Sequence, residues 1–163
     1  MPVREVSIIH NQGETKLLRS VKLLGVAAAV SGAAILSTGP AHAYPYWQGV
    51  NLTPYWHCGT TTYHNASYNV LMQTCIVLTP DNQYAQSVLV VRNNASVAIN
   101  ISGYTEDGFG GGVSPCNTSS LNPGLVTGCY GPTVNVAGQS PLKAIGHLVM
   151  NNIGDDTFGN VLL

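Results

Sequence analysis

Three histidines are the residues best suited to acid–base chemistry after the N-terminal segment: His57, His64 and His147. Nucleophilic catalysis needs a nucleophile, a base and an orienting acid held together. The chain has no G-x-S-x-G or comparable nucleophile signature. His147 lies in an alternating segment typical of a strand, and the other two flank Cys58 in a polar segment. We therefore assign no catalytic residue and expect a non-enzymatic protein.

Two pairs of adjacent carboxylates, Glu106–Asp107 and Asp155–Asp156, could in principle serve glycoside hydrolysis. Neighbouring residues in an extended or turning chain point their side chains apart, so these pairs favour turn-forming and solubilising roles. A weak calcium site is the alternative, because Ca²⁺ binds carboxylates and loop carbonyls. The glycine run Gly108–Gly112 lacks the Lys and Ser/Thr of a phosphate-binding loop. We expect no cofactor.

Four cysteines, Cys58, Cys75, Cys116 and Cys129, lie in the part that follows the N-terminal segment. An even number in a secreted chain indicates disulfides, and three pairings are possible. We favour Cys58–Cys75 with Cys116–Cys129, because each closes a short loop. A metal site using His57, Cys58, His64 and Cys75 is disfavoured, since no pair has the spacing of zinc ligands. We therefore predict no metal.

The candidate binding site is an aromatic segment before the first cysteine. Five aromatic residues fall within thirteen positions, together with two prolines that disfavour a helix or a central strand. Tyrosine and tryptophan dominate interface hot spots. The rings could equally fold into the domain's own core, or stack on sugars. The candidate partner-binding residues are Tyr44, Tyr46, Trp47, Tyr55 and Trp56.

The N-terminal segment is typical of a secretory signal peptide. A polar stretch with four basic residues is followed by an apolar run from Leu23 to Leu36, and then by an Ala-x-Ala cleavage site ending at Ala43. The apolar run is short for a membrane span, so we expect a soluble, extracellular product. The segment resembles actinobacterial signal peptides. The mature chain carries Arg92 and Lys143 against five carboxylates, which leaves no basic surface for nucleic acid or anionic lipid.

The best-specified structure is predicted at Gln86–Tyr104, where two β-branched runs flank a polar Asn93–Ser96 turn; we interpret it as a β-hairpin. Val70–Thr79 predicts a central strand, apolar on both faces. Thr105–Gly131 predicts a long irregular loop held by Cys116–Cys129. Further strands are expected at Pro132–Ala137, Leu142–Met150 and Phe158–Leu163.

Six or seven short strands with regular turns indicate an all-β fold, a small antiparallel β-sandwich that is immunoglobulin-like in the loose sense. The cysteine spacing does not fit the bridge that joins the two sheets of an immunoglobulin domain. The domain plan is a signal peptide over residues 1–43, an aromatic N-terminal arm over 44–57 and a disulfide-stapled β-sandwich over 58–163.

This plan of signal peptide, aromatic extension and cysteine-bridged β-sandwich resembles the small secreted adaptor subunits of streptomycete umbrella toxin particles. The resemblance covers the mature chain as an architecture. It implies a non-enzymatic link between a lectin-like subunit and a large toxin subunit, with an N-terminal extension entering a cleft of the lectin. The matching segment here is Tyr44–Trp56.

Three functions are therefore carried forward. The first is a secreted protein-interaction module, an adaptor or accessory subunit of an extracellular complex that binds other secreted proteins partly through the arm. The second is a protease inhibitor that presents the Cys116–Cys129 loop, because a preorganised loop binds well. The third is a small hydrolase or a glycan-binding domain.

The signal-peptide prediction is tested by the N-terminus of the secreted protein. We expect the chain recovered from culture medium to begin at Tyr44, because cleavage follows the Ala-x-Ala motif. Intact-mass measurement of the secreted protein checks this. A secreted chain that retains residues 1–43 would contradict the prediction.

Overall fold

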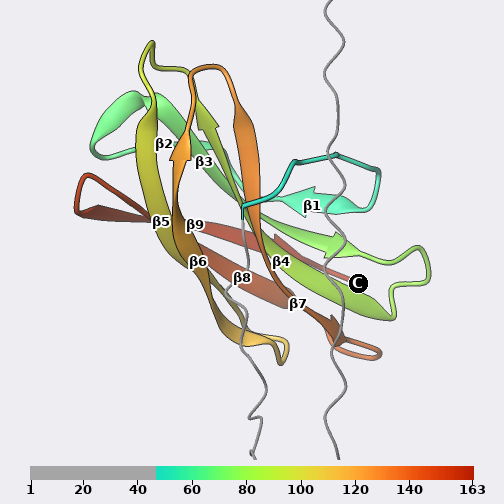
Figure 1. Cartoon of the computed structure of the whole chain (residues 1–163). Coiled ribbons are helices and arrows are strands. Elements are labelled where there is room, and N and C mark those ends of the chain that lie inside the picture. The colour runs from blue at the N-terminus through green and yellow to red at the C-terminus, as the bar shows by residue number, and fades with distance from the viewer. Residues whose placement is uncertain (1–46) are drawn as a thin grey trace, which may run out of the picture. The chain divides into compact units, whose positions relative to one another are not determined.

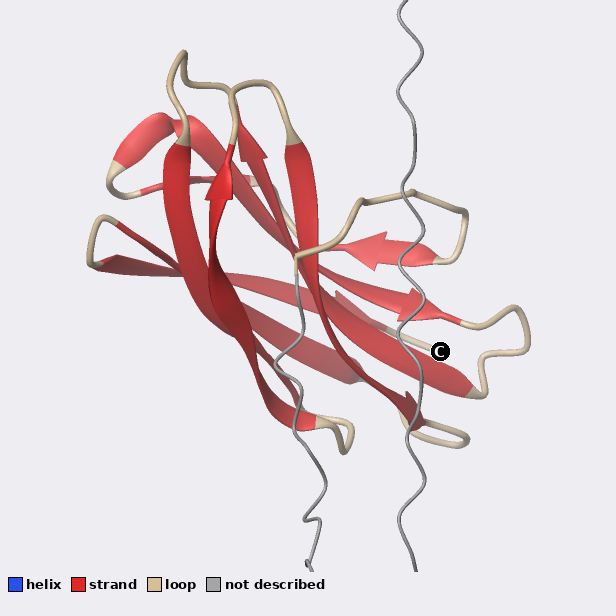
Figure 2. Ribbon diagram, viewed as in Figure 1, coloured by secondary structure: helices blue, strands red, loops and turns tan. Residues whose placement is uncertain are grey.

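A computed structural model describes residues 47–163; the predicted signal peptide, Tyr44 and Tyr46 lie outside the described residues. Two antiparallel sheets contain nine strands within this range, with no helix among the described residues, so the predicted β-sandwich is confirmed. Figure 2 shows that strands and short connections make up the described chain. Sheet A contains β1 (Trp56–Cys58), β2 (Thr62–His64), β3 (Ser67–Leu78), β4 (Tyr84–Asn93) and β7 (Val126–Asn135). Sheet B contains β5 (Ile99–Asp107), β6 (Gly112–Leu121), β8 (Leu142–Met150) and β9 (Ile153–Val161).

The strand order is β1-β3-β4-β7 in sheet A, with β2 also paired to β3, and β6-β5-β8-β9 in sheet B. The predicted central strand is β3, which has neighbours on both sides (Figure 1). The predicted strand at Leu142–Met150 is β8, with the same bounds. Its alternate residues Ala144, Leu148 and Met150 are buried, as an alternating strand with one buried face requires.

The hairpin predicted at Gln86–Tyr104 is wrong: β4 and β5 belong to different sheets. Both edges of β4 are already occupied, by β3 and β7, so β5 crosses over and pairs with β6 and β8. The buried side chain of Asn93 organises the crossover by donating to the carbonyls of Val97 and Leu121, each at 2.9 Å. Two asparagines do form a tight hairpin elsewhere, because Asn151 and Asn152 have φ of 53° and 62° between β8 and β9.

The long irregular loop predicted at Thr105–Gly131 is also wrong, because this stretch contains β6 and the first part of β7. The sequence of β6 resembles a loop because β6 is an edge strand, with Gly112, Pro115, Thr118 and Ser120 among its exposed positions. The turn between β6 and β7 lies beside the β4–β5 crossover, and Asn93 exchanges backbone hydrogen bonds with Gly124 and Leu125 there (Figure 1).

Both predicted disulfides are present, Cys58–Cys75 and Cys116–Cys129. The first joins directly opposed residues of β1 and β3 within sheet A. The second joins β6 of sheet B to β7 of sheet A. Residues this near in sequence can bridge the two sheets because the crossover from β6 to β7 brings them onto opposite sheets.

The inward-facing residues form two apolar clusters separated by a narrow layer of small and polar residues, which we call the waist. One cluster includes Met72, Leu89 and Leu148, and the other includes Ile76 and Leu142. Between them, on six strands in turn, lie Thr74, Ser87, Thr105, Gly131, Gly146 and Thr157. The sheets approach closely at this layer.

Hydrogen bonds join the two sheets at the waist, and a glycine there allows them to approach closely. The Thr74 hydroxyl donates to the carbonyl of Thr157 at 2.9 Å, and Ser87 and Thr105 share a hydrogen bond at 3.0 Å. These contacts satisfy buried hydroxyls that would otherwise cost about 1–3 kcal/mol each. A Cβ on Gly146 would lie 2.5 Å from Thr74 Oγ1 and 2.8 Å from Leu89 Cδ1, so only glycine fits there without movement of a neighbour.

Adding one methyl group at the waist tests its tightness. We expect Gly146→Ala to lower the free energy of unfolding by about 1–3 kcal/mol, because overpacking moves Thr74 or Leu89. Urea unfolding measures the change. Gly49→Ala is the matched control, since nothing lies within 4 Å of its Cβ; its effect should stay within about 0.5 kcal/mol. Equal stability of the two variants would contradict a tight waist.

Candidate functional site

Trp47, the first described residue of the predicted arm, packs against the domain. Its ring contacts the apolar cluster that contains Cys116 and Cys129. Its indole N–H donates to the backbone carbonyl of Asn117 at 2.7 Å. Asn117 belongs to β6, the edge strand of sheet B, so Trp47 helps to close the side of the sandwich where β6 faces β7.

The residues after Trp47 attach to the free edge of β7. Gln48 and Gly128 exchange backbone hydrogen bonds of 2.8 Å in both directions. The Thr127 hydroxyl donates to the carbonyl of Gln48 at 3.0 Å, and the Tyr130 hydroxyl donates to the carbonyl of Gly49 at 3.1 Å. The start of the described arm therefore acts as a short extra edge strand.

Trp56, at the other end of the arm, covers the outer face of sheet A. Its ring meets that of Tyr130 edge-to-face, with 6.0 Å between centroids. Val88 points to this outer face and is fully buried. Partial burial raises the pKa of the Tyr130 phenol. Both tryptophans are therefore anchors of the fold rather than freely exposed rings.

Between the anchors, residues 51–55 form an exposed turn, which we call the arm loop. Leu52 is 67% exposed and Tyr55 is 41% exposed. The loop is ordered by its own backbone, since the Trp56 N–H donates to the Thr53 carbonyl at 3.1 Å. The Leu78 N–H donates to the Tyr55 carbonyl at 3.0 Å, which fixes the loop to β3. Of the three predicted partner-binding residues that the structure describes, Trp47, Tyr55 and Trp56, only Tyr55 lies in this exposed loop.

His64 is a structural residue, buried between the two sheets and only 1% exposed. Its Nδ1 accepts a hydrogen bond from the Ala66 N–H at 3.1 Å, which leaves the ring hydrogen on Nε2. Nε2 then donates to the Leu148 carbonyl at 3.2 Å. This bond ties the β2–β3 hairpin to sheet B.

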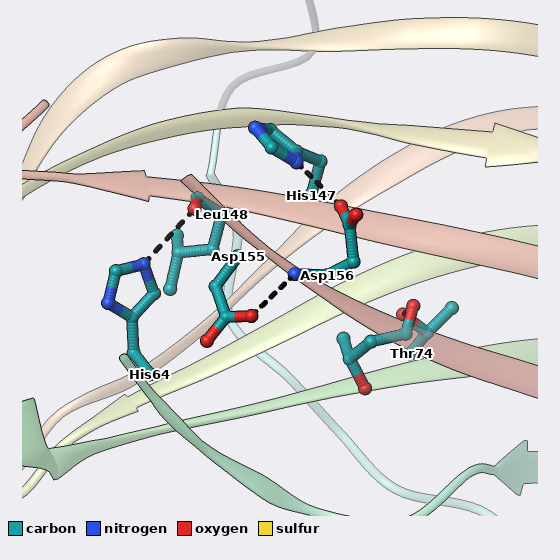
Figure 3. A network of polar contacts seen from close by, with 7 residues as sticks. His64, Thr74, His147, Leu148, Asp155 and Asp156 are labelled. Atoms are coloured by element: carbon teal, nitrogen blue, oxygen red, sulfur yellow. Dashed lines mark hydrogen bonds and ion pairs between the residues drawn. The ribbon is translucent and has the colours of Figure 1, made fainter. Parts of the chain in front are cut away.

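His147 lies on the opposite face of sheet B, as Figure 3 shows, with its ring directed away from His64. Nδ1 is 2.6 Å from Asp156 Oδ1 on β9. The imidazole stacks on the ring of Tyr104, with 4.8 Å between centroids and 16° between planes. Within the described residues, the side chain to which this imidazole is hydrogen-bonded is the Asp156 carboxylate.

The adjacent carboxylates diverge as expected. Asp107 faces inward, where one oxygen accepts hydrogen bonds from the N–H groups of Phe109 and Gly111, whereas Glu106 is exposed. Asp155 accepts a hydrogen bond from the Asn65 N–H at 2.8 Å, and Asp156 pairs with His147. Among the residues that the structure describes, no group of three potential ligands could hold a metal ion.

The Cys116–Cys129 segment consists mainly of two strands and exposes one short turn, residues 122–125. Leu125 is the large apolar side chain that this turn presents to solvent. The loop that an inhibitor would insert is therefore much shorter than the predicted one.

No family model matches the chain, and no curated protein matches its sequence. Within residues 47–163, no helix has the length and hydropathy needed to cross a membrane. The two disulfides are consistent with an extracellular protein.

Two features of potential function were missed from the sequence. Leu52 was overlooked because it is a lone aliphatic residue among aromatics, although a position between Asn51 and Pro54 is typical of an exposed turn. The stack of Tyr104 on His147 depends on the pairing of β5 with β8, which no local pattern reveals. The only signal was the alternation of Leu142–Met150, which places His147 on the face opposite Leu148.

Alanine substitutions separate the anchors from the exposed loop. We expect Trp47→Ala to lower the free energy of unfolding by about 2–3 kcal/mol, because it removes apolar contacts and the hydrogen bond to Asn117. Tyr55→Ala should change stability by less than about 0.5 kcal/mol. Thermal and urea unfolding measure both. A larger loss for Tyr55→Ala than for Trp47→Ala would contradict these assignments.

Proposed function

We propose that the chain is a secreted, non-enzymatic protein-interaction module, an adaptor or accessory subunit of an extracellular complex. Its contact with a partner is made through the arm loop. The observation that supports this proposal best is the exposure of Leu52 and Tyr55 between two anchored ends.

Anchoring both ends favours binding. An unattached arm would lose much conformational entropy when it docks, and this loss opposes association. Here Trp47 and Gln48 hold the start of the described part of the arm on β6 and β7, and Trp56 holds its end on sheet A. The loop is therefore ordered before it meets a partner, so less entropy is lost on binding. A leucine beside a tyrosine supplies the apolar contact that an interface core needs.

The lack of charged residues in and around the arm loop also favours an uncharged interface. Within residues 47–58 there is no Asp, Glu, Lys or Arg, so desolvating the arm loop carries no penalty for buried charges. An uncharged partner cleft lined by apolar groups fits this loop. Such a role agrees with the adaptor subunits that the chain resembles, whose N-terminal extension enters a cleft of a lectin-like subunit.

The inhibitor alternative has weaker support. The turn at residues 122–125 carries no Arg or Lys for a trypsin-like pocket. Gly124 and Leu125 also exchange backbone hydrogen bonds with Asn93, which holds the turn against the crossover instead of projecting it as an extended, substrate-like loop.

Site-specific photocrosslinking tests the role of the arm loop. We expect a photoreactive p-benzoylphenylalanine at position 52 to form a covalent adduct with one protein in the culture medium of the producing organism. Position 97 is the matched control, because Val97 is 63% exposed, close to the 67% of Leu52. Mass spectrometry identifies the adduct.

The proposal fails if position 52 gives no adduct, or if both positions give the same adducts. A second variant, Leu52→Ser with Tyr55→Ala, should abolish co-purification of the captured protein while leaving the melting temperature unchanged, because both side chains are exposed.

A further inference from the structure

The outer face of sheet B carries an aromatic strip that the fold itself does not use. Strands β5, β8 and β9 alternate, so one set of side chains enters the core and the other faces outward. Two neighbouring outward rows cross the three strands. They are Tyr104–His147–Asp156 and Glu106–Ile145–Phe158. None of these six residues belongs to either core cluster.

The first row is a preorganised ring platform. Three contacts fix the imidazole of His147: the stacked Tyr104 ring, the Asp156 carboxylate at 2.6 Å, and the bare backbone of Gly154. A Cβ on Gly154 would lie 2.6 Å from His147 Nε2, so the ring occupies space that a side chain would take. The two stacked rings belong to neither core cluster, and the His147 side chain is still 24% exposed on the outer face of sheet B.

The second row borders a groove. Phe158 is 62% exposed, although a large apolar side chain on a strand is usually covered. A groove of about 420 Å³ runs beside it, lined also by Ile145, Lys143, Asn160 and Thr60. This size lies within the range of small-molecule sites, roughly 300–1,000 Å³. The lining combines one aromatic ring with an amide, a hydroxyl and an ammonium group.

We propose that this face binds an uncharged saccharide chain. A pyranose ring has one face of C–H groups, which packs on an aromatic ring, and a rim of hydroxyls, which needs hydrogen-bonding groups beside that ring. The platform and Phe158 supply the rings, and Asp156, Glu106 and Asn160 supply the polar groups. The two rows are two residues apart along each strand, or about 7 Å. One short oligosaccharide can therefore contact both.

Charge on this face matches a neutral ligand. Lys143 and Glu106 have opposite signs on adjacent strands, and the Asp156 carboxylate is hydrogen-bonded to the His147 ring. A face with so few charges does not attract a strongly anionic or cationic polymer over long distances. The site is separate from the arm loop and goes beyond the proposed protein-interaction function.

Native affinity electrophoresis of the whole mature protein tests the proposal. The probes are soluble β-glucan, xylan and mannan in the gel, with chitin and cellulose pull-downs for insoluble polymers. We expect at least one uncharged polysaccharide to retain the protein. Phe158→Ala, which removes an exposed ring, and Gly154→Ala, which displaces the His147 ring, should each weaken that binding about tenfold.

Tyr68→Ala is the control for nonspecific aromatic contact, because Tyr68 is 86% exposed on β3 of sheet A; it should bind as the unmodified protein does. Thermal unfolding checks that each variant folds. The proposal is overturned if no uncharged polysaccharide retains the protein, if only heparin or polygalacturonate does, or if Tyr68→Ala loses as much binding. Unchanged binding by Phe158→Ala or Gly154→Ala overturns it as well. It is likewise overturned if no polysaccharide binds and Phe158→Ala instead abolishes binding of a protein, because the face would then be a protein-binding surface.

Discussion

The close approach of the two sheets at the waist is the constraint on which the rest of the structure depends. Thr74 and Thr157, and Ser87 and Thr105, join the sheets by hydrogen bonds where an apolar core would have larger side chains. Gly146 lies opposite Thr74, and it lacks the Cβ atom that would push the two sheets apart. Because the waist is narrow, the apolar side chains divide into two clusters instead of one continuous layer. Each cluster then fills the wider space on its side of the waist.

Two packed sheets leave two open sides, and this chain closes each by a different means. On one side, the disulfide Cys116–Cys129 and the ring of Trp47 join β6 to β7. On the other, Gly59 lies against the backbone of Phe158, where any Cβ would collide with the Phe158 carbonyl oxygen. The first closure recruits the N-terminal arm into the domain. Within residues 47–57, the exposed part of the arm is therefore the loop between its two anchors.

Local patterns in the sequence predicted those features that depend on alternation or on short chain separation. Strand β8, the central β3 and both disulfides follow from such patterns. The predicted Gln86–Tyr104 hairpin is wrong because both edges of β4 are taken by other strands. They are β3, which directly precedes β4, and β7, which is more distant in sequence than β5. Strand β6 was missed because an edge strand faces solvent and has few apolar residues. The cluster of aromatic residues before Cys58 is evident in the sequence. Which of the described ones anchor the fold and which lie in the exposed loop depends on tertiary contacts that no local pattern reveals.

The same limit explains why the outer face of sheet B was not predicted. The alternation of β8 is enough to place His147 on the outer face. It does not predict which side chains of the neighbouring strands lie beside His147. Those neighbours come from β5 and β9. The Asn151–Asn152 turn sets the register of β9 on β8, whereas β5 pairs with β8 although β6 and β7 lie between them in the sequence. A shift of one residue in β9 would turn Asp156 and Phe158 inward and place Thr157 outside. The buried Thr157 carbonyl, bound to Thr74 at the waist, opposes that shift. The contacts that bring the sheets together therefore also fix the arrangement of side chains on the exposed face.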